Sequence, residues 1–202
     1  PTVTPMSFSR DDVAVESTEA VYDGYFRIDR FILRHALHAG GMGPALSREV
    51  FDRGTVAAVL PVDPATDQVV LIEQFRPGAY AAGWDPWLLE CVAGVVEPGE
   101  TAEDVARRET EEEAGITLGQ LEPIARFLTS PGATSETLDL FVGRVDASRA
   151  NGIHGLASEG EVIRVLTLSI KEAVDALDRG LIVNAKTVIA LHWLARHYSG
   201  LK

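Results

Sequence analysis

Short runs of alternating or β-branched apolar residues fill the first quarter of the chain and predict strands. The first runs are VAVES, which begins at Val13, and YFRIDRFILRHAL, which ends at Leu37, with Asp23-Gly24 as a turn signal between them. LSREVFDRG then resumes a strand before Gly54. Together these runs predict a small antiparallel sheet. Because so small a sheet is not stable alone, it must pack on the rest of the chain or on a second chain.

More continuous apolar runs follow and predict a second, larger sheet. TVAAVLPVD (55–63) and QVVLIEQFR (68–76) flank a polar turn and predict a hairpin, and PIARFLTS, TLDLFVGRV and VIRVLTL predict further strands. Near the end of the chain, Ser169 and Glu172 form a capping box for a helix that runs to Gly180, and Asn184 caps another helix. This order predicts an α/β (α+β) fold, with residues 1–53 as the small antiparallel sheet and residues 54–202 as a mixed sheet sandwiched between helices.

Between these strands lies a strongly acidic stretch, GVVEPGETAEDVARRETEEEAGI, at residues 94–116. Thr101 and Asp104 form a capping box after a Pro-Gly turn, and Gly115 is a typical helix stop. The stretch therefore predicts a helix over residues 102–114.

Three carboxylates share one face of this predicted helix. Glu109, Glu112 and Glu113 stand at i, i+3 and i+4, and they continue the small apolar stripe that begins at Ala102 and Val105. Like charges at this spacing cost about 0.2–0.5 kcal/mol per pair, and more where water is excluded. A hard divalent cation would relieve the repulsion, and Mg²⁺ is the usual partner of carboxylates and substrate phosphates. The alternative from the helix alone is an ordinary solvated, charged face.

Composition narrows the class of function. The 202 residues carry a net charge of −12, which argues against a nucleic-acid backbone or an anionic membrane surface as the main partner. The single cysteine, Cys91, lies in the apolar run WLLECVAG and predicts a buried thiol rather than a nucleophile. With no signal-peptide pattern and no long apolar segment, the sequence predicts a cytoplasmic protein.

The acidic stretch resembles the Nudix box, G-x5-E-x7-R-E-U-x-E-E-x-G-U, in which U is a bulky apolar residue. One position departs from the pattern: Thr110 stands where an aliphatic residue is expected, which bears on local packing more than on metal binding. The positions that match are Gly94, Glu100, Arg108, Glu109, Glu112, Glu113, Gly115 and Ile116.

The resemblance extends over roughly residues 13–198, to the bacterial ADP-ribose pyrophosphatase branch of the Nudix hydrolases. VLIEQFRPGAY, WLLECVAGVVEPGE, LTSPGATSE, GIHGLASEGE and NAKTVIALHWL carry it. It implies the Nudix fold and a homodimer with exchanged N-terminal sheets. It also implies hydrolysis of ADP-ribose to AMP and ribose 5-phosphate, dependent on Mg²⁺ or Mn²⁺.

The resemblance also implies roles for residues of the acidic stretch. Glu109 and Glu113 are expected to bind the metal, with Glu112 alongside and the backbone carbonyl of Ala93 completing the ligand set. Arg108 is expected to pair with these carboxylates and orient them. Glu97 and Glu100 rank lower as ligands, since Glu100 precedes the helix and is as well suited to holding the loop.

The general base is expected outside the box, on the glycine-rich loop 151–161. That loop offers Glu159 and Glu161, and its backbone could close over the substrate and exclude water. We favour Glu159 as the base and keep Glu161 as the alternative. A diphosphate needs such help because its dense negative charge repels the attacking water.

Substrate contacts are expected from four further residues by the same resemblance. Arg76 and Arg48 resemble the arginines that hold the diphosphate and the terminal ribose, and Arg48 would reach in from the N-terminal segment. Tyr25 occupies the aromatic position for adenine stacking, and Glu49 would accept a hydrogen bond nearby. The N-terminal segment would thus serve both dimerisation and substrate binding.

Two other functions remain open from the sequence. One is hydrolysis of another nucleoside diphosphate sugar such as GDP-mannose, because the residues of the box do not determine whether the substrate carries adenine or guanine. The other is a non-catalytic module that binds ADP-ribose or a related nucleotide, for which loss of box carboxylates would be typical. Here Glu109, Glu112 and Glu113 are all present, which favours an enzyme.

Overall fold

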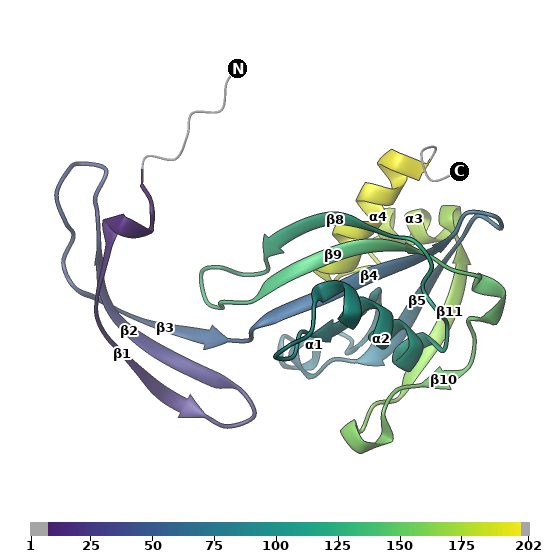
Figure 1. The fold of residues 1–202 in the computed structure, drawn as a ribbon, viewed down its shortest axis with the longest axis horizontal. Helices are drawn as coiled ribbons and strands as arrows, with labels where there is room; N and C mark the ends of the chain where they lie inside the picture. Colours follow the sequence, from purple (N-terminus) through teal and green to yellow (C-terminus); the bar gives the residue numbers. More distant parts are fainter. Residues whose placement is uncertain (1–7, 199–202) are drawn as a thin grey trace. The chain divides into compact units, whose positions relative to one another are not determined.

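In the computed structural model, residues 8–198 are described, and the chain forms two units (Figure 1). The first unit contains the residues up to Gly54 together with Ser130–Glu136. The second contains Thr55–Thr129 and the residues from Thr137 onward. Ser130–Glu136 falls within the predicted domain 54–202 by sequence, but its contacts group it with the first unit.

The first unit is a three-stranded antiparallel sheet in the order β1-β2-β3, as the apolar pattern predicts. The segment Ser130–Glu136 lies along the end of β3, because Phe51 N donates to Ala133 O at 2.9 Å and Ser135 N donates to Phe51 O at 3.0 Å. The elements of this unit are η1 (Arg10–Asp12), β1 (Val13–Asp23), β2 (Arg27–His35) and β3 (Leu46–Asp52).

This sheet has no core of its own. None of the residues of β1, β2 or β3 is buried, and every residue of β1 is exposed. Cross-strand ion pairs link the strands: Arg30 on β2 contacts Glu19 on β1 at 3.0 Å and Glu49 on β3 at 2.9 Å. Exposed pairs of this kind contribute little to stability, so apolar cover from elsewhere is expected.

The second unit contains a mixed eight-stranded sheet and the remaining helices. Its main path runs β10-β11-β5-β4-β9-β8, in which β4 and β9 are parallel and the other neighbours are antiparallel. The elements are β4 (Thr55–Asp63), β5 (Gln68–Phe75), α1 (Pro77–Ala81), β6 (Trp87–Glu90), β7 (Val92–Val95), α2 (Ala102–Ala114), β8 (Leu121–Leu128), β9 (Thr137–Arg144), η2 (Ala147–Arg149), β10 (Ile153–His154), η3 (Ala157–Glu159), β11 (Ile163–Ser169), α3 (Ile170–Asp178) and α4 (Ala185–His197).

The strands β4 and β5 pair only beside their connecting turn and then separate. Beyond that point β6 pairs with β5, and β7 pairs with β4, so the segment WLLECVAGV enters between the two strands. Cys91, at the corner between β6 and β7, is fully buried, and its backbone N donates to Thr187 Oγ1 on α4 at 2.8 Å. This insertion brings the start of the acidic stretch into the interior of the sheet.

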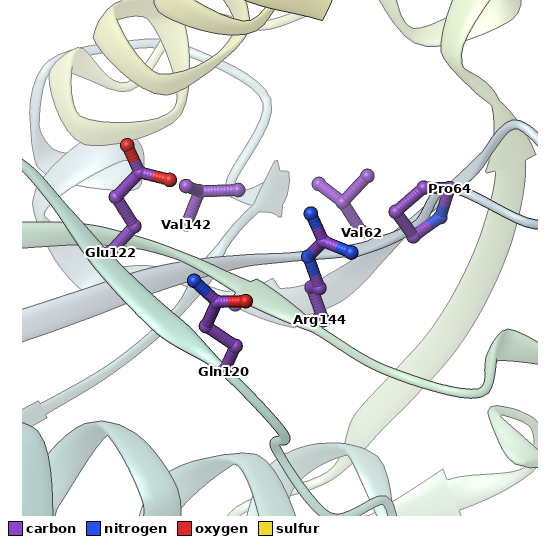
Figure 2. Close-up of a pocket in the computed structure, with 7 residues that line it drawn as sticks. Val62, Pro64, Gln120, Glu122, Val142 and Arg144 are labelled. Carbon is purple, nitrogen blue, oxygen red and sulfur yellow. The ribbon is translucent and has the colours of Figure 1, made fainter. Parts of the chain in front are cut away.

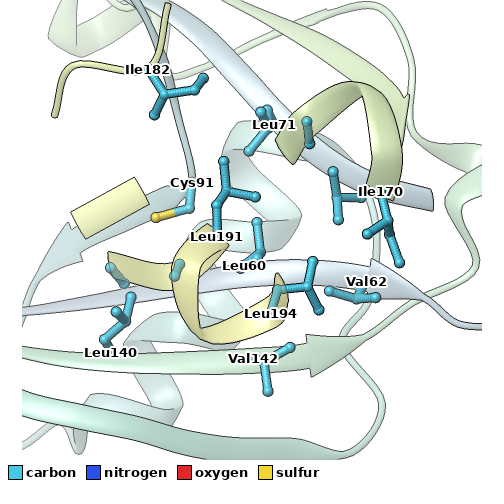
Figure 3. Packing of buried hydrophobic residues seen from close by; sticks show 14 of the residues in the cluster. Leu60, Val62, Leu71, Cys91, Leu140, Val142, Ile170, Ile182, Leu191 and Leu194 are labelled. Atoms are coloured by element: carbon cyan, nitrogen blue, oxygen red, sulfur yellow. The ribbon is translucent and has the colours of Figure 1, made fainter. Parts of the chain in front are cut away.

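Two apolar clusters fill the two faces of the sheet, because side chains alternate along each strand. One cluster joins Leu60, Leu71 and Leu140 to Leu191 and Leu194 of α4, together with α3 (Figure 3). The other joins neighbouring strand positions to α2 and the residues that follow it. The predicted sandwich of a mixed sheet between helices is therefore confirmed.

Local capping sets the bounds of α2. Thr101 Oγ1 accepts from Asp104 N at 3.2 Å, Asp104 Oδ2 accepts from Thr101 N at 3.0 Å, and Gly115 ends the helix with φ of 67°. The side chain of Thr110, at the departing box position, is buried, and its hydroxyl donates to Ala106 O at 2.7 Å. The hydroxyl is thereby satisfied inside the apolar cluster.

Some elements differ from the sequence prediction. Tyr25 lies in the turn before β2 rather than on a strand, and the loop PGAYAAGWDP contains the short helix α1. WLLECVAG forms the two strands β6 and β7. None of the helices within residues 8–198 combines the length and the apolar character that a membrane span requires.

Candidate active site

Two carboxylates of α2 lie against the backbone of β7. Glu113 Oε2 accepts from Ala93 N at 3.1 Å, and the residue is 3% exposed. Glu109 lies over the next residue, where a Cβ added to Gly94 would stand 1.8 Å from Glu109 Oε1. A side chain at position 94 would therefore displace Glu109, which gives the box glycine a steric reason.

Arg108 joins the remaining acidic residues of this region. Its Nη1 donates to Glu109 Oε1 at 2.9 Å and to Glu112 Oε2 at 3.1 Å, while its Nε donates to Glu100 Oε1 at 3.0 Å. Glu100 Oε2 also accepts from Glu97 N at 3.1 Å, so Glu100 holds the turn before the helix. The arrangement fits the expected orienting role of Arg108, and it gives Glu100 a structural role.

The pKa values of both carboxylates are raised. Burial raises the pKa of Glu113 to about 8, and the charge of Glu109 adds to the rise, against the hydrogen bond from Ala93 N. Burial also raises the pKa of Glu109, although Arg108 opposes that rise. Such buried, partly compensated acids are typical of functional sites.

The expected metal ligands fit a hard divalent cation, because each of them is a carboxylate or carbonyl oxygen. They are Glu109, Glu112, Glu113 and the backbone carbonyl of Ala93. Within residues 8–198, however, no group of three or more Asp, Glu, His or Cys side chains is arranged to hold a metal ion. Arg108 contacts Glu109 and Glu112, and Ala93 N contacts Glu113. Metal binding therefore requires these carboxylates to exchange protein donors for the cation.

A second ionic cluster joins the ends of β5 and β6 to the start of α4. Arg76 follows β5, and its Nη2 donates to Glu90 Oε2 on β6 at 2.6 Å. Lys186 Nζ, from the first turn of α4, contacts the same oxygen at 2.6 Å. Arg76 is a predicted substrate residue, whereas Glu90 and Lys186 were not predicted. A lysine in the first turn of a helix is electrostatically unfavourable, which is the one sequence signal that marked it.

The loop 151–161 is tied to the end of α2. Gly155 N donates to Glu112 O at 3.3 Å, and Glu161 Oε2 accepts from Leu156 N at 3.3 Å. The charge of Glu161 contributes to the raised pKa of Glu109, so this carboxyl group lies near the box carboxylates. Glu159 ends η3, and its side chain lies outside the part of the chain that the structure describes.

The other three predicted substrate residues belong to the first unit. Arg48 Nη1 donates to the neighbouring Ser47 O at 2.8 Å, and Glu49 Oε1 accepts from Arg30 Nη2 at 2.9 Å. Tyr25 is 91% exposed, and its ring meets Phe26 edge-on at 4.7 Å between centroids. Their substrate roles stay predictions.

A small pocket in the second unit lies at a different place (Figure 2). It contains none of the predicted site residues, and its lining joins the start of β8 to the ends of β4 and β9. The lining residues are Val62, Pro64, Gln120, Glu122, Val142, Gly143 and Arg144. We assign it no role in the chemistry.

Comparison with known proteins shows a family match and close relatives. The model of the NUDIX domain matches residues 52–190. ADP-ribose pyrophosphatase of Escherichia coli (strain K12) is 49% identical over 198 residues, which cover 98% of this chain and 95% of that protein. ADP-ribose pyrophosphatase of Haemophilus influenzae is 41% identical, with 96% of this chain and 91% of that protein covered.

More distant similarity reaches other diphosphatases. GDP-mannose pyrophosphatase of Cronobacter sakazakii is 36% identical over 184 residues, which cover 88% of this chain and 95% of that protein. A crystal structure described as an ADP compounds hydrolase superposes with a TM-score of 0.73 at 20% identity, covering 96% of this chain and 98% of that one. The structural likeness bears on the fold alone.

Proposed function

The chain belongs to the Nudix family, whose members are generally metal-dependent, and we propose that it hydrolyses the diphosphate of ADP-ribose to AMP and ribose 5-phosphate. The observation that carries the chemistry is the pair of the half-buried Glu109 and the buried Glu113, which lie against β7 with raised pKa values. The choice of ADP-ribose is supported by the 49% and 41% identity to proteins named for that substrate.

The charged residues on one side of α2 and the neighbouring carbonyl of Ala93 then have chemical roles. Glu109 and Glu113, with Glu112 and the carbonyl of Ala93, would hold Mg²⁺ or Mn²⁺. When bound, the metal neutralises diphosphate oxygens and favours ionisation of a water. Arg108 keeps Glu109 and Glu112 oriented through hydrogen bonds of 2.9 and 3.1 Å.

The remaining residues bind the substrate and move the proton. Arg76 presents a guanidinium to the diphosphate, and Arg48, Tyr25 and Glu49 contact the ribose and adenine ends. Glu159 accepts a proton from the attacking water, while Glu161 supports the carboxylate cluster from the same loop. The glycine-rich backbone of residues 151–161 lets this loop close and exclude bulk water.

The assignment of Glu159 as the general base predicts that Glu159→Gln and Glu161→Gln differ in kcat. Glu159→Gln is expected to lower kcat by about 10²–10⁴-fold with little change in KM, because the amide cannot accept the proton. Glu161→Gln is expected to cost less, since that side chain acts on other carboxylates. Steady-state kinetics of both variants would measure the difference. Near wild-type turnover in Glu159→Gln, with loss of turnover in Glu161→Gln, would reverse the assignment.

A homodimer with exchanged N-terminal sheets accompanies this proposal. Its support is the first unit, in which all of β1 is exposed and none of the three strands has a buried residue. A second copy would supply the missing apolar cover and would bring Arg48 to its partner's site. A gel-filtration mass of one chain would contradict this part. A cytoplasmic location stays a prediction from the sequence pattern and the single cysteine.

The experiment that tests the function is a phosphate-release panel. ADP-ribose, GDP-mannose, NADH, diadenosine polyphosphates and an oxidised nucleoside triphosphate are each incubated with Mg²⁺ and with chelator. We expect ADP-ribose to have the highest kcat/KM, in the presence of Mg²⁺. GDP-mannose as best substrate would favour the second candidate, which the 36% identity to a GDP-mannose pyrophosphatase supports. Binding of ADP-ribose without turnover of any compound would indicate a non-catalytic module.

A further inference from the structure

Three charged side chains from separate parts of the chain meet at one carboxylate oxygen. Glu90 Oε2 accepts from Arg76 Nη2 and contacts Lys186 Nζ, each at 2.6 Å, and Arg76 Nε adds a third contact at 3.0 Å. The side chain of Glu90 is 3% exposed and that of Lys186 is 13% exposed, whereas that of Arg76 is 36% exposed. The two inner groups are therefore shielded from water, and Arg76 reaches the surface.

This cluster carries an excess positive charge. One carboxylate faces two cations, although the contacts between Arg76 and Glu90 would by themselves give a neutral pair. The second cation, Lys186, is largely buried, so its ammonium group loses hydration on folding, which costs free energy. It also lies in the first turn of α4, where the helix dipole repels a positive charge. A fold that needed only an internal ion pair would not require Lys186.

The excess charge lies close to the site. Glu90 stands three residues before Ala93, whose backbone N donates to Glu113 Oε2 at 3.1 Å. A further donor lies two residues before Arg76: Gln74 of β5 is 6% exposed, and its Nε2 has no hydrogen-bond partner among the described residues. Because side chains two positions apart in extended chain point to the same face, Gln74 and Arg76 can both serve an oxygen-rich anion there.

We propose that Lys186 is a positioning residue for the anionic diphosphate: it neutralises Glu90, so that the charge of Arg76 stays available to the substrate. This inference rests on the proposed function, because it assumes that a diphosphate binds at Arg76. It differs from a purely structural role, in which Lys186 would only satisfy the buried carboxylate of Glu90.

The net charge of the cluster in suitable variants separates a role of Lys186 in charge from a purely structural role. The native cluster carries a net charge of +1, from two cations and one anion. Lys186→Met removes one positive charge and keeps the length of the side chain, which leaves a neutral pair. The double variant Glu90→Gln with Lys186→Met leaves the guanidinium of Arg76 alone, so its net charge is again +1. A role in charge predicts that KM and Kd rise in Lys186→Met and recover in the double variant, whereas a purely structural role predicts that folded Lys186→Met already binds ADP-ribose as wild type does.

The test measures kcat and KM for ADP-ribose with Mg²⁺, and the Kd for ADP-ribose by calorimetry with chelator. Lys186→Met is expected to raise KM and Kd about tenfold with kcat changed less than about twofold, because one partly shielded charge is lost. The double variant and Lys186→Arg are expected to return both constants to within about threefold of wild type. Lys171→Met is the matched control, since Lys171 pairs with the exposed Asp175 at 2.5 Å.

Two results would overturn the proposal. One is a Lys186→Met variant whose KM and Kd stay within about twofold of wild type. The other is a double variant that binds no better than Lys186→Met while thermal unfolding shows both to be folded. Failure of the proposed function is recognised separately, as wild-type protein that binds ADP-ribose in chelator but does not hydrolyse it with Mg²⁺.

Discussion

Glu113→Gln is expected to lower kcat/KM for ADP-ribose by about a thousandfold while the protein stays folded. The amide keeps the size of the side chain and an oxygen that can accept from Ala93 N, so the contact with β7 at 3.1 Å can persist. What is lost is the negative charge that would hold the metal. A bound metal lowers the barrier by several kcal/mol, so its loss slows the reaction. Steady-state kinetics at saturating Mg²⁺ would measure the loss.

The matched control is Glu111→Gln on the same helix. Glu111 is exposed and lies between the carboxylates in sequence but on another face of α2. The substitution Glu111→Gln removes the same charge from the helix as Glu113→Gln does. The kcat/KM of this variant is expected to stay within about twofold of wild type. Equal losses in both variants would mean that the net charge of α2, rather than a metal ligand, accounts for the effect.

Chelation is expected to abolish turnover and to expose an unusual pH dependence of stability. The pKa of Glu113 rises from an ordinary 4.5 to about 8 in the folded chain. Between these values the folded state keeps a proton that the unfolded state has released. The contribution of protonated Glu113 to the free energy of unfolding is therefore fully present below about pH 4.5 and is lost as the pH rises towards 8. Mg²⁺ added near pH 8 is expected to restore both activity and stability, because it replaces that proton.

Thermal unfolding across pH, with chelator and with Mg²⁺, would check this expectation. Other groups titrate as well, so the informative quantity is the difference between wild type and Glu113→Gln. In chelator, that difference is expected to change with pH mainly between 4.5 and 8. A flat difference, or a chelated wild type that becomes more stable as pH rises relative to the variant, would contradict the assigned charge state.

Local sequence signals predicted the helix α2 and the face on which its carboxylates lie. The capping box of Thr101 and Asp104 and the stop at Gly115 lie within a few residues of the elements that they bound, so the bounds Ala102–Ala114 could be predicted. The spacing of Glu109 and Glu113 follows from helix periodicity in the same way. Continuous apolar runs on either side of a polar turn likewise predicted the long strands β4 and β5.

Long-range pairings could not be predicted in this way. Lys186 and Glu90 meet across 96 positions, and only the fold shows that the first turn of α4 lies beside the end of β6. The strands β6 and β7 were missed because WLLECVAG is short, mostly apolar and without clear alternation, and such runs fit several structures. Their place between β4 and β5 depends on the whole sheet.

The corner at Cys91 has a practical consequence for spectroscopy. Burial raises the pKa of its thiol to about 11, so almost no thiolate forms at neutral pH and the sulfur is shielded from reagents. As the sequence contains no other cysteine, a new one placed at the exposed Ser158 would react alone with a maleimide dye. Fluorescence from that label would then test whether residues 151–161 move when ADP-ribose is added.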